Sequence, residues 1–213
     1  MRIGVIGTGI VGQVLGAGFA AVGHEVMMGS RDPKQERIVR WLASAGERAS
    51  SGTNTEAAVF GEIIVLATAW DGVENAIRLA GPDNMTGKVV IDATNPLRMT
   101  AAGPELAIGH TDSAGEQVQR WLPNARVVKA FNSIGNQHMV NPSFPGGPPD
   151  MFICGNDDSA KRTVTDLLNS FGWSAIDLGG IESARYLEPL GMIWITHLIR
   201  SGSGDHAFKL LRK

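Results

Sequence analysis

The sequence contains a single cysteine, Cys154, among its 213 residues, so no intramolecular disulfide and no cysteine-rich zinc site can form. One cysteine fits a reducing compartment. Lysine and arginine are scattered without a basic run and the formal net charge is −2, which argues against nucleic-acid binding. No apolar run reaches the roughly 18 residues of a membrane span, and no signal-peptide cleavage pattern follows the N-terminus. We therefore expect a cytoplasmic protein with neither a nucleic-acid nor a membrane partner.

Short apolar runs alternate with helical patterns along most of the chain, and 27 glycines are available for the turns between them. Continuous apolar runs separated by helices are typical of parallel strands that are buried on both faces. The sequence therefore predicts an α/β fold with a doubly wound, mostly parallel Rossmann sheet. Strands are expected at 3–6, 25–29, 48–51, 63–67, 88–92, 126–130, 151–155 and 174–177. Helices are expected at 11–22, 35–45, 54–60, 72–79, 114–122 and 159–171.

The C-terminal part of the chain has a different pattern. Residues 1–178 form the predicted nucleotide-binding domain, and residues 179–213 form a small helical segment that we expect to pack on the same domain. The stretch 181–199 is apolar and helical, and Pro189 should kink this helix or split it in two. Its many apolar side chains, Ile193 and Trp194 among them, predict the interface of a homodimer.

A glycine-rich stretch, Gly7-Thr8-Gly9-Ile10-Val11-Gly12, directly follows the first predicted strand and opens the first predicted helix. This context is the one that a dinucleotide-binding fingerprint requires. Gly7 permits the tight turn, Gly9 lets a pyrophosphate approach the backbone, and Gly12 lets the helix pack closely on the sheet. The N–H groups at the helix start then face the phosphates.

The end of the second predicted strand indicates which dinucleotide binds. An acidic residue there would bind the ribose 2′-hydroxyl of NAD, but the sequence has Ser30 and Arg31 at this point. A hydroxyl and a planar guanidinium suit the 2′-phosphate of NADP. Asp32 could serve NAD if the turn is shifted by a residue or two, and it could instead cap the following helix, with Pro33 in the first helical position.

Three further loops follow predicted strands, where ligands lie in such sheets. In Ala67-Thr68-Ala69-Trp70, small residues would let a ribose or nicotinamide lie close, while Trp70 either walls the pocket or anchors the loop. In Asn95-Pro96-Leu97, the amide of Asn95 beside a rigid proline is placed to bind a carboxamide. The third loop, 129–135, contains Asn132.

The sequence contains no recognisable set of acid–base catalytic residues. The five histidines are His24, His110, His138, His197 and His206, and a structural role is favoured for each of them. We therefore predict no catalytic residue and no metal site. Hydride transfer between two stacked rings would be compatible with this, because it needs proximity and orientation more than acid–base chemistry.

Taken together, these residues resemble the F420-dependent NADP oxidoreductase family over most of the chain. The resemblance rests on the following stretches: Met1 to Gly9, Gly29-Ser30-Arg31, 91–97, 128–135, 152–157 and 184–190. It implies a compact dinucleotide fold with a small C-terminal helical piece. Members pass hydride between NADP(H) and the deazaflavin F420, whereas related domains reduce a flavin.

The resemblance also implies roles for particular residues. Pyrophosphate and ribose contacts come from Thr8 to Val11, and 2′-phosphate contacts come from Ser30 and Arg31. The nicotinamide pocket is lined by Ala67, Ala69, Asn95 and Leu97, while Asn132 stands where deazaflavin-using members can carry a histidine. Two alternatives stay open: an NADPH-dependent reductase of a small carbonyl or imine compound, and a protein that senses NADP(H) without turnover.

Overall fold

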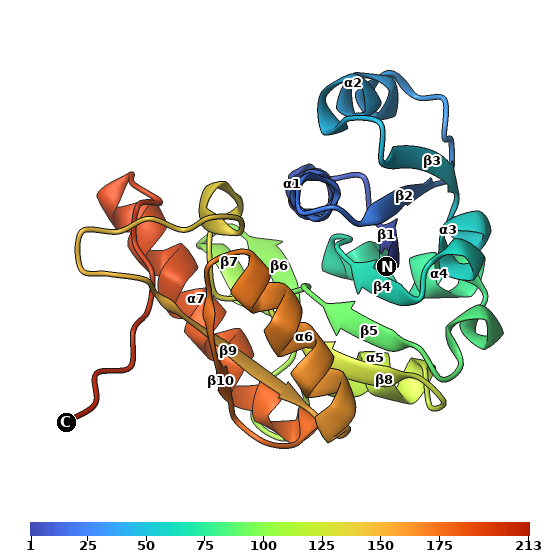
Figure 1. Cartoon of the computed structure of the whole chain (residues 1–213). Coiled ribbons are helices and arrows are strands. Elements are labelled where there is room, and N and C mark those ends of the chain that lie inside the picture. The colour runs from blue at the N-terminus through green and yellow to red at the C-terminus, as the bar shows by residue number, and fades with distance from the viewer.

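The computed structural model describes residues 1–213 and is built around an eight-stranded sheet, with a separate two-stranded sheet at one side (Figure 1). The strand order in the main sheet is β10-β9-β8-β5-β4-β1-β2-β3, and the small sheet is β6-β7. The strands are β1 Arg2–Ile6, β2 Glu25–Ser30, β3 Ala49–Thr53, β4 Ile63–Leu66, β5 Val89–Asp92, β6 Leu97–Thr100, β7 Gly103–Leu106, β8 Arg126–Lys129, β9 Asp150–Gly155 and β10 Ser174–Asp177. The α-helices are α1 Ile10–Ala21, α2 Glu36–Ala45, α3 Asn54–Phe60, α4 Trp70–Ala80, α5 Ala114–Trp121, α6 Asp158–Ser170 and α7 Ala184–Ser201.

The predicted mostly parallel, doubly wound sheet is confirmed. Strands β3, β2, β1, β4, β5 and β8 are parallel, β9 pairs antiparallel with β8, and β10 runs parallel to β9. The chain moves from β1 outward to β3 and then returns to place β4 on the other side of β1. This reversal between β1 and β4 is the topological switch point at which such sheets bind ligands.

The register of the parallel strands aligns the predicted loops. Ile6 pairs with both Gly29 and Leu66, Leu66 pairs with Asp92, and Asp92 pairs with Lys129. These five residues form one row across the sheet at the carboxyl ends of its strands. The loops that leave β1, β2, β4, β5 and β8 therefore start at nearly the same level and meet along one edge.

Two hydrophobic clusters cover the two faces of the sheet. Successive side chains of a strand point to opposite faces, so Ile63 and Val65 enter one cluster while Ile64 and Leu66 enter the other. Helices α1, α2 and α6 contribute to the first cluster, and α3, α4, α5 and α7 to the second. Burial on both faces explains why the central strands are almost uniformly apolar.

Two local expectations need correction. Helix α2 begins at Glu36 with Gln35 as its N-cap, because the Asp32 carboxylate accepts the Lys34 N–H at 3.0 Å and holds a separate turn before the helix. The region between β5 and α5, which has no strand in the sequence-based pattern, contains the antiparallel hairpin β6-β7. Thr53 caps α3 and forms a capping box with Glu56.

Pro189 does not split the C-terminal helix. Helix α7 runs without interruption from Ala184 to Ser201, with Pro189 inside it and a short 3₁₀ turn, Ile181–Ser183, before it. Proline removes one backbone hydrogen bond, but the neighbouring Leu187 and Trp194 are buried against the rest of the protein. Tertiary packing therefore outweighs the local cost of the proline.

The last residues of the chain fold back on the domain. The Asp150 N–H donates to the Phe208 carbonyl at 3.0 Å, and the Leu210 N–H donates to the Asp150 carboxylate at 2.7 Å. Trp194 of α7 stacks on His206 with ring centroids 4.6 Å apart. None of the helices combines the length with the hydropathy that a membrane-spanning segment needs.

Candidate functional site

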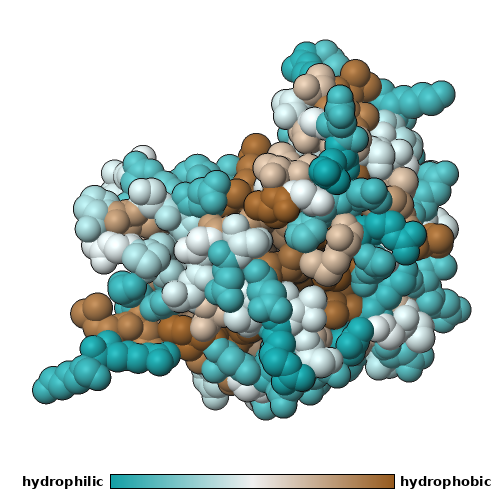
Figure 2. Space-filling view, viewed as in Figure 1, coloured by the Kyte–Doolittle hydropathy of each residue, from teal (hydrophilic) through white to brown (hydrophobic).

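A cleft of about 460 Å³ lies at the carboxyl ends of β1, β2 and β4, beside the switch point. Its volume falls in the usual range for small-molecule sites. Eight of the residues selected from the sequence line it: Gly7, Thr8, Gly9, Ser30, Arg31, Ala67, Thr68 and Ala69. Figure 2 shows hydrophobic residues in the middle of the visible face, between the positions that α2 and α7 have in Figure 1.

The glycines of the turn after β1 have distinct reasons for lacking a side chain. Gly7 has φ +132°, and a Cβ at this position would overlap the Ala67 carbonyl. A Cβ on Gly12 would overlap the Gly7 carbonyl oxygen, so Gly12 allows α1 to pack on the turn. Gly9 is different, because its φ of −71° suits any residue and a Cβ there would meet nothing within 4 Å. Its open surface is suited to close approach by a ligand.

Fixed polar groups in the cleft remain available to a ligand. The Thr68 Oγ1 atom is buried and has no hydrogen-bond partner within the protein. A buried hydroxyl without a partner is costly, so it indicates a group that acts when ligand is bound. Helix α1 also begins at Ile10 with no side-chain cap, which leaves its first N–H groups facing the turn. These features fit a dinucleotide whose pyrophosphate lies at the start of α1.

The loop after β2 is held by the side chain of Ser30. The Ser30 hydroxyl donates to the Asp32 carbonyl at 2.9 Å and accepts the Asp32 N–H at 3.1 Å and the Gln35 Nε2 at 2.6 Å. Ser30 is itself buried, so its main visible effect is to shape the turn. Arg31 is exposed, lines the cleft and makes no ion pair or side-chain hydrogen bond with the protein.

The other selected residues of this region lie outside the cleft lining. Ile10, Val11 and Gly12 form the first turn of α1, directly after the glycine-rich turn. Trp70 is the first residue of α4, and its ring stacks on Trp121 with centroids 5.6 Å apart. This contact supports the anchoring alternative for Trp70, because the indole packs against α5 beside the second hydrophobic cluster.

Asn95 and Asn132 form a second group of polar side chains at the same sheet edge. Asn95 Nδ2 donates to the Asn132 carbonyl at 2.7 Å, and Asn132 Nδ2 donates to Asn95 Oδ1 at 3.1 Å and to the Leu187 carbonyl at 2.8 Å. The Asn132 Oδ1 atom is buried and has no partner, as with Thr68 Oγ1. A carboxamide N–H₂ is a group that such an acceptor would bind.

The backbone at this second group is strained. Phe131 has φ +64°, a left-handed conformation that is uncommon for a bulky residue and that occurs often at functional sites.

Leu97 begins β6 and pairs with Leu106, so the hairpin extends directly from the Asn95-Pro96-Leu97 loop. Asn95, Pro96, Leu97 and Asn132 thus lie beyond β5 and β8, apart from the lining of the cleft beyond β1, β2 and β4.

Beneath this edge the protein buries three charged side chains. Lys129 Nζ lies 2.7 Å from Asp92 Oδ2 and 3.0 Å from Glu188 Oε1, and all three side chains are almost completely inaccessible. Burial alone would lower the pKa of Lys129, but the two carboxylates outweigh it and raise the pKa above its usual value. The same burial raises the pKa of the nearby Cys154 to about 12, so this thiol is not a nucleophile at neutral pH.

Several residues that line the cleft were not selected from the sequence. Besides Gly29 and Asp32, which were considered from the sequence, the cleft is also lined by Gln35, Arg37, Asn54, Asp71, Gly72, Asn75, Ala76 and Leu79. A signal existed for some of them, since Gln35 and Arg37 lie in the first turn of the expected second helix and Asp71 directly precedes the expected fourth helix. The buried trio was also signalled, because Asp92 and Lys129 are charged residues that end apolar strands. No group of residues has the arrangement of a metal site.

Comparisons with known proteins identify the family of this chain. Residues 2–96 match the family described as "NADP oxidoreductase coenzyme F420-dependent". The F420-dependent NADP reductase of Methanothermobacter thermautotrophicus is 32% identical over 94% of this chain and 90% of its own length. The metalloreductase STEAP3 of Rattus norvegicus is 29% identical over 89% of this chain, which spans only 36% of that longer protein.

A solved structure extends the likeness to the whole fold. The crystal structure of a candidate F420-dependent NADP reductase from Arthrobacter sp. FB24 has a TM-score of 0.94 and 36% identity, with complete coverage of both chains. The imine reductase of Streptomyces aurantiacus has a TM-score of 0.66 at 18% identity, over 94% of this chain and 64% of that one, and shows a shared fold only. The chain therefore belongs to the F420-dependent NADP oxidoreductase family, which confirms the predicted class of NADP-dependent oxidoreductase.

Proposed function

We propose that this protein transfers a hydride between NADP(H) and the deazaflavin F420 or a flavin. The observation that carries the proposal is the cleft at the switch point, whose β2 loop presents Arg31 where an NAD-binding site would present an acidic residue. Whole-length likeness to F420-dependent NADP reductases supports the choice of acceptor.

The residues of the chain serve mainly to bind and orient. The turn from Gly7 to Gly12 holds the pyrophosphate, Arg31 receives the 2′-phosphate from a turn that Ser30 shapes, and Ala67, Thr68 and Ala69 lie along the ribose. The group from Asn95 to Leu97, together with Asn132, borders the nicotinamide. NADPH, when bound, supplies the hydride, and the protein supplies orientation and proximity to the acceptor.

An anaerobic acceptor panel tests this proposal. Purified protein is mixed with NADPH and, in separate reactions, with F420, riboflavin, FMN, a small cyclic imine and a small carbonyl compound. We expect loss of NADPH absorbance to accompany reduction of F420 or a flavin, and NADH to be a much poorer donor. Turnover of the imine or carbonyl alone would support the second function considered from the sequence. NADPH binding without any turnover would support a sensing role.

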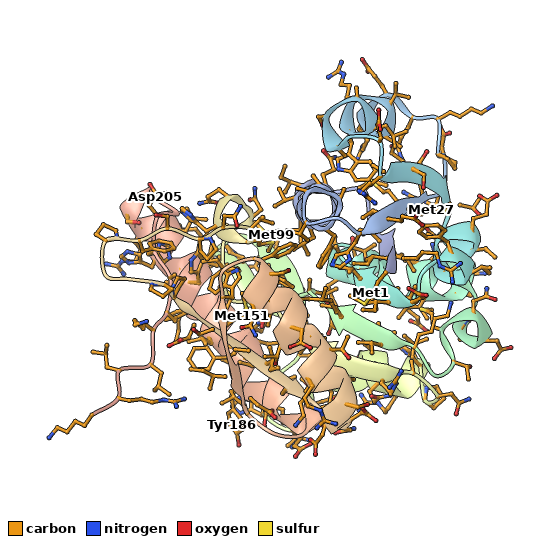
Figure 3. The ribbon with its side chains drawn as sticks, in the orientation of Figure 1. Met1, Met27, Met99, Met151, Tyr186 and Asp205 are labelled. Carbon is orange, nitrogen blue, oxygen red and sulfur yellow. The ribbon has the colours of Figure 1, made fainter.

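We also propose that the protein is a homodimer formed through α7. Tyr186, Ile193 and Ile199 on this helix are exposed although they are large and apolar, and Figure 3 shows Tyr186 near one end of the helix. Apolar surface beyond the needs of a monomer often marks an interface. Sedimentation or light scattering at micromolar concentration tests this, and a monomer alone would contradict it.

A cytoplasmic location of the protein and the division of the chain at residue 178 also remain predictions.

A further inference from the structure

The cleft contains a second arginine, Arg37, close to the loop after β2, since Gln35 at the start of α2 donates to Ser30 at 2.6 Å. Arg37 is the second residue of α2, whereas Arg31 lies in the loop after β2, and both side chains line the cleft. Neither guanidinium forms an ion pair or donates a hydrogen bond to the protein. Arg40, one turn further along α2, differs because it pairs with Glu36 and does not line the cleft.

The position of Arg37 is set by the packing of α2. Trp41 lies four residues further along, is buried, and donates from Nε1 to the Gln13 carbonyl at 2.9 Å. A Cβ on Gly16 would lie 2.9 Å from the Trp41 ring, so α1 and α2 meet closely there. Residues four apart share a helix face. The contact at Trp41 therefore directs Arg37, at the start of α2, toward the end of the cleft formed by the loop after β2.

A second cation in the cleft would favour the binding of a phosphate monoester. Such a group carries about −1.5 to −2 charges at neutral pH. Arg31 supplies one positive charge, while Asp32 adds a carboxylate to the same lining. The Ser30 hydroxyl already gives its proton to the Asp32 carbonyl. Arg31 alone thus leaves much of the phosphate charge uncompensated, and Arg37 is a second cation in the lining of the same cleft.

We infer that Arg37 is a specificity-determining residue that binds the 2′-phosphate of NADP(H) together with Arg31. The inference deepens the proposed NADP(H) site and rests on it, but it does not depend on the identity of the hydride acceptor. Its direct consequence is that discrimination between NADPH and NADH comes from two separate elements, the β2 loop and the start of α2.

Binding measurements on the full chain test this inference without any acceptor. Adenosine 2′,5′-bisphosphate and AMP differ only in the 2′-phosphate, so their dissociation constants by calorimetry isolate that group. Loss of one charge-assisted contact in Arg37→Ala should weaken bisphosphate binding by about tenfold. AMP binding should be unchanged, and Arg37→Lys should retain part of the affinity. Arg31→Ala should behave like Arg37→Ala, and the combined variant should be weaker than either.

Arg40→Ala is the matched control, because Arg40 is an exposed arginine of the same helix outside the cleft. It should change the affinity for neither ligand. Equal losses of bisphosphate and AMP binding in Arg37→Ala, or no loss at all, would overturn the inference. If wild-type protein reduces no deazaflavin or flavin while the selective loss is seen, only the proposed function fails. If wild-type protein is active and Arg37→Ala binds normally, only this inference fails.

Discussion

Lys129 of β8 and Glu188 of α7 form an ion pair in the interior of the protein, with Nζ and Oε1 3.0 Å apart. Glu188 also accepts the N–H groups of Ala114 and Gly115 at the start of α5, each at 3.0 Å. A carboxylate at a helix N-terminus is favoured by the helix dipole. One buried acid therefore holds α7 to both the sheet and α5, close to the Leu187 carbonyl that binds Asn132.

Lys129→Met should destabilise the protein strongly. It removes the cation that compensates Asp92 and Glu188 and leaves both carboxylates buried, a change that costs about 3–5 kcal/mol of unfolding free energy. Urea denaturation measures the loss. A triple variant with Asp92→Asn and Glu188→Gln should recover part of it, because no uncompensated charge remains. A loss of under about 1 kcal/mol, the value for an exposed pair, would contradict the burial described here.

Gly9→Ala and Gly12→Ala should separate a binding glycine from a packing glycine. The Gly9 conformation suits alanine and the space beside it is open, so stability should stay the same while NADPH affinity falls. A methyl group on Gly12 overlaps the Gly7 carbonyl oxygen, so stability should fall by about 1–3 kcal/mol or more. Thermal melting and NADPH titration of both variants test this. Unchanged NADPH affinity in Gly9→Ala would place the pyrophosphate elsewhere.

Asn132→Ala should weaken the nicotinamide end of the site and spare the adenosine end. It removes the unpartnered Oδ1 acceptor, which we expect to lower NADPH affinity by about tenfold. Adenosine 2′,5′-bisphosphate should bind normally because it lacks the nicotinamide. Asn169→Ala, an exposed asparagine near the end of α6, serves as the control. Equal losses for both ligands would point to a general disturbance of the fold.

The contact between Glu116 and Arg185 should make the anchoring of α7 sensitive to acid. Hydrogen bonds from Arg185 hold the pKa of Glu116 below its usual value of 4.5, against the opposing effect of burial. A lowered pKa in the folded state stabilises the protein above the unfolded-state pKa, and this stability is lost as the pH falls through the folded-state pKa. Glu116→Gln should lower the melting temperature at neutral pH by roughly 2 °C.

Melting curves across the acid range complete this test. The difference between wild-type protein and Glu116→Gln should shrink below the pKa of Glu116 and vanish once the carboxyl is protonated. Arg120→Ala is a useful comparison, because it removes the ion pair of an α5 residue with Asp112, which precedes the helix, without touching α7. A difference that persists unchanged in acid would show that Glu116 acts by packing rather than by charge.

The local sequence pattern was sufficient to predict much of the fold and the adenosine half of the candidate site. Strand and helix periods arise from backbone geometry, so apolar spacing indicates the parallel strands and their intervening helices. The positive φ of Gly7 and the packing of Gly12 on the Gly7 carbonyl both belong to one β-α turn, and Arg31 follows β2 directly. A short segment contains all the information that these features need.

Only the tertiary structure decided which distant residues meet. Arg37 reaches the cleft because Trp41 packs on α1, and Lys129 becomes a buried anchor because α7 brings Glu188 to it. The continuous helix through Pro189 and the contact of Asn132 with Leu187 depend on the same packing. The glycine-rich turn thus predicts a dinucleotide-binding site from the sequence alone. The charges and amides around it depend on long-range contacts, whose energies exceed the local preferences that a sequence pattern expresses.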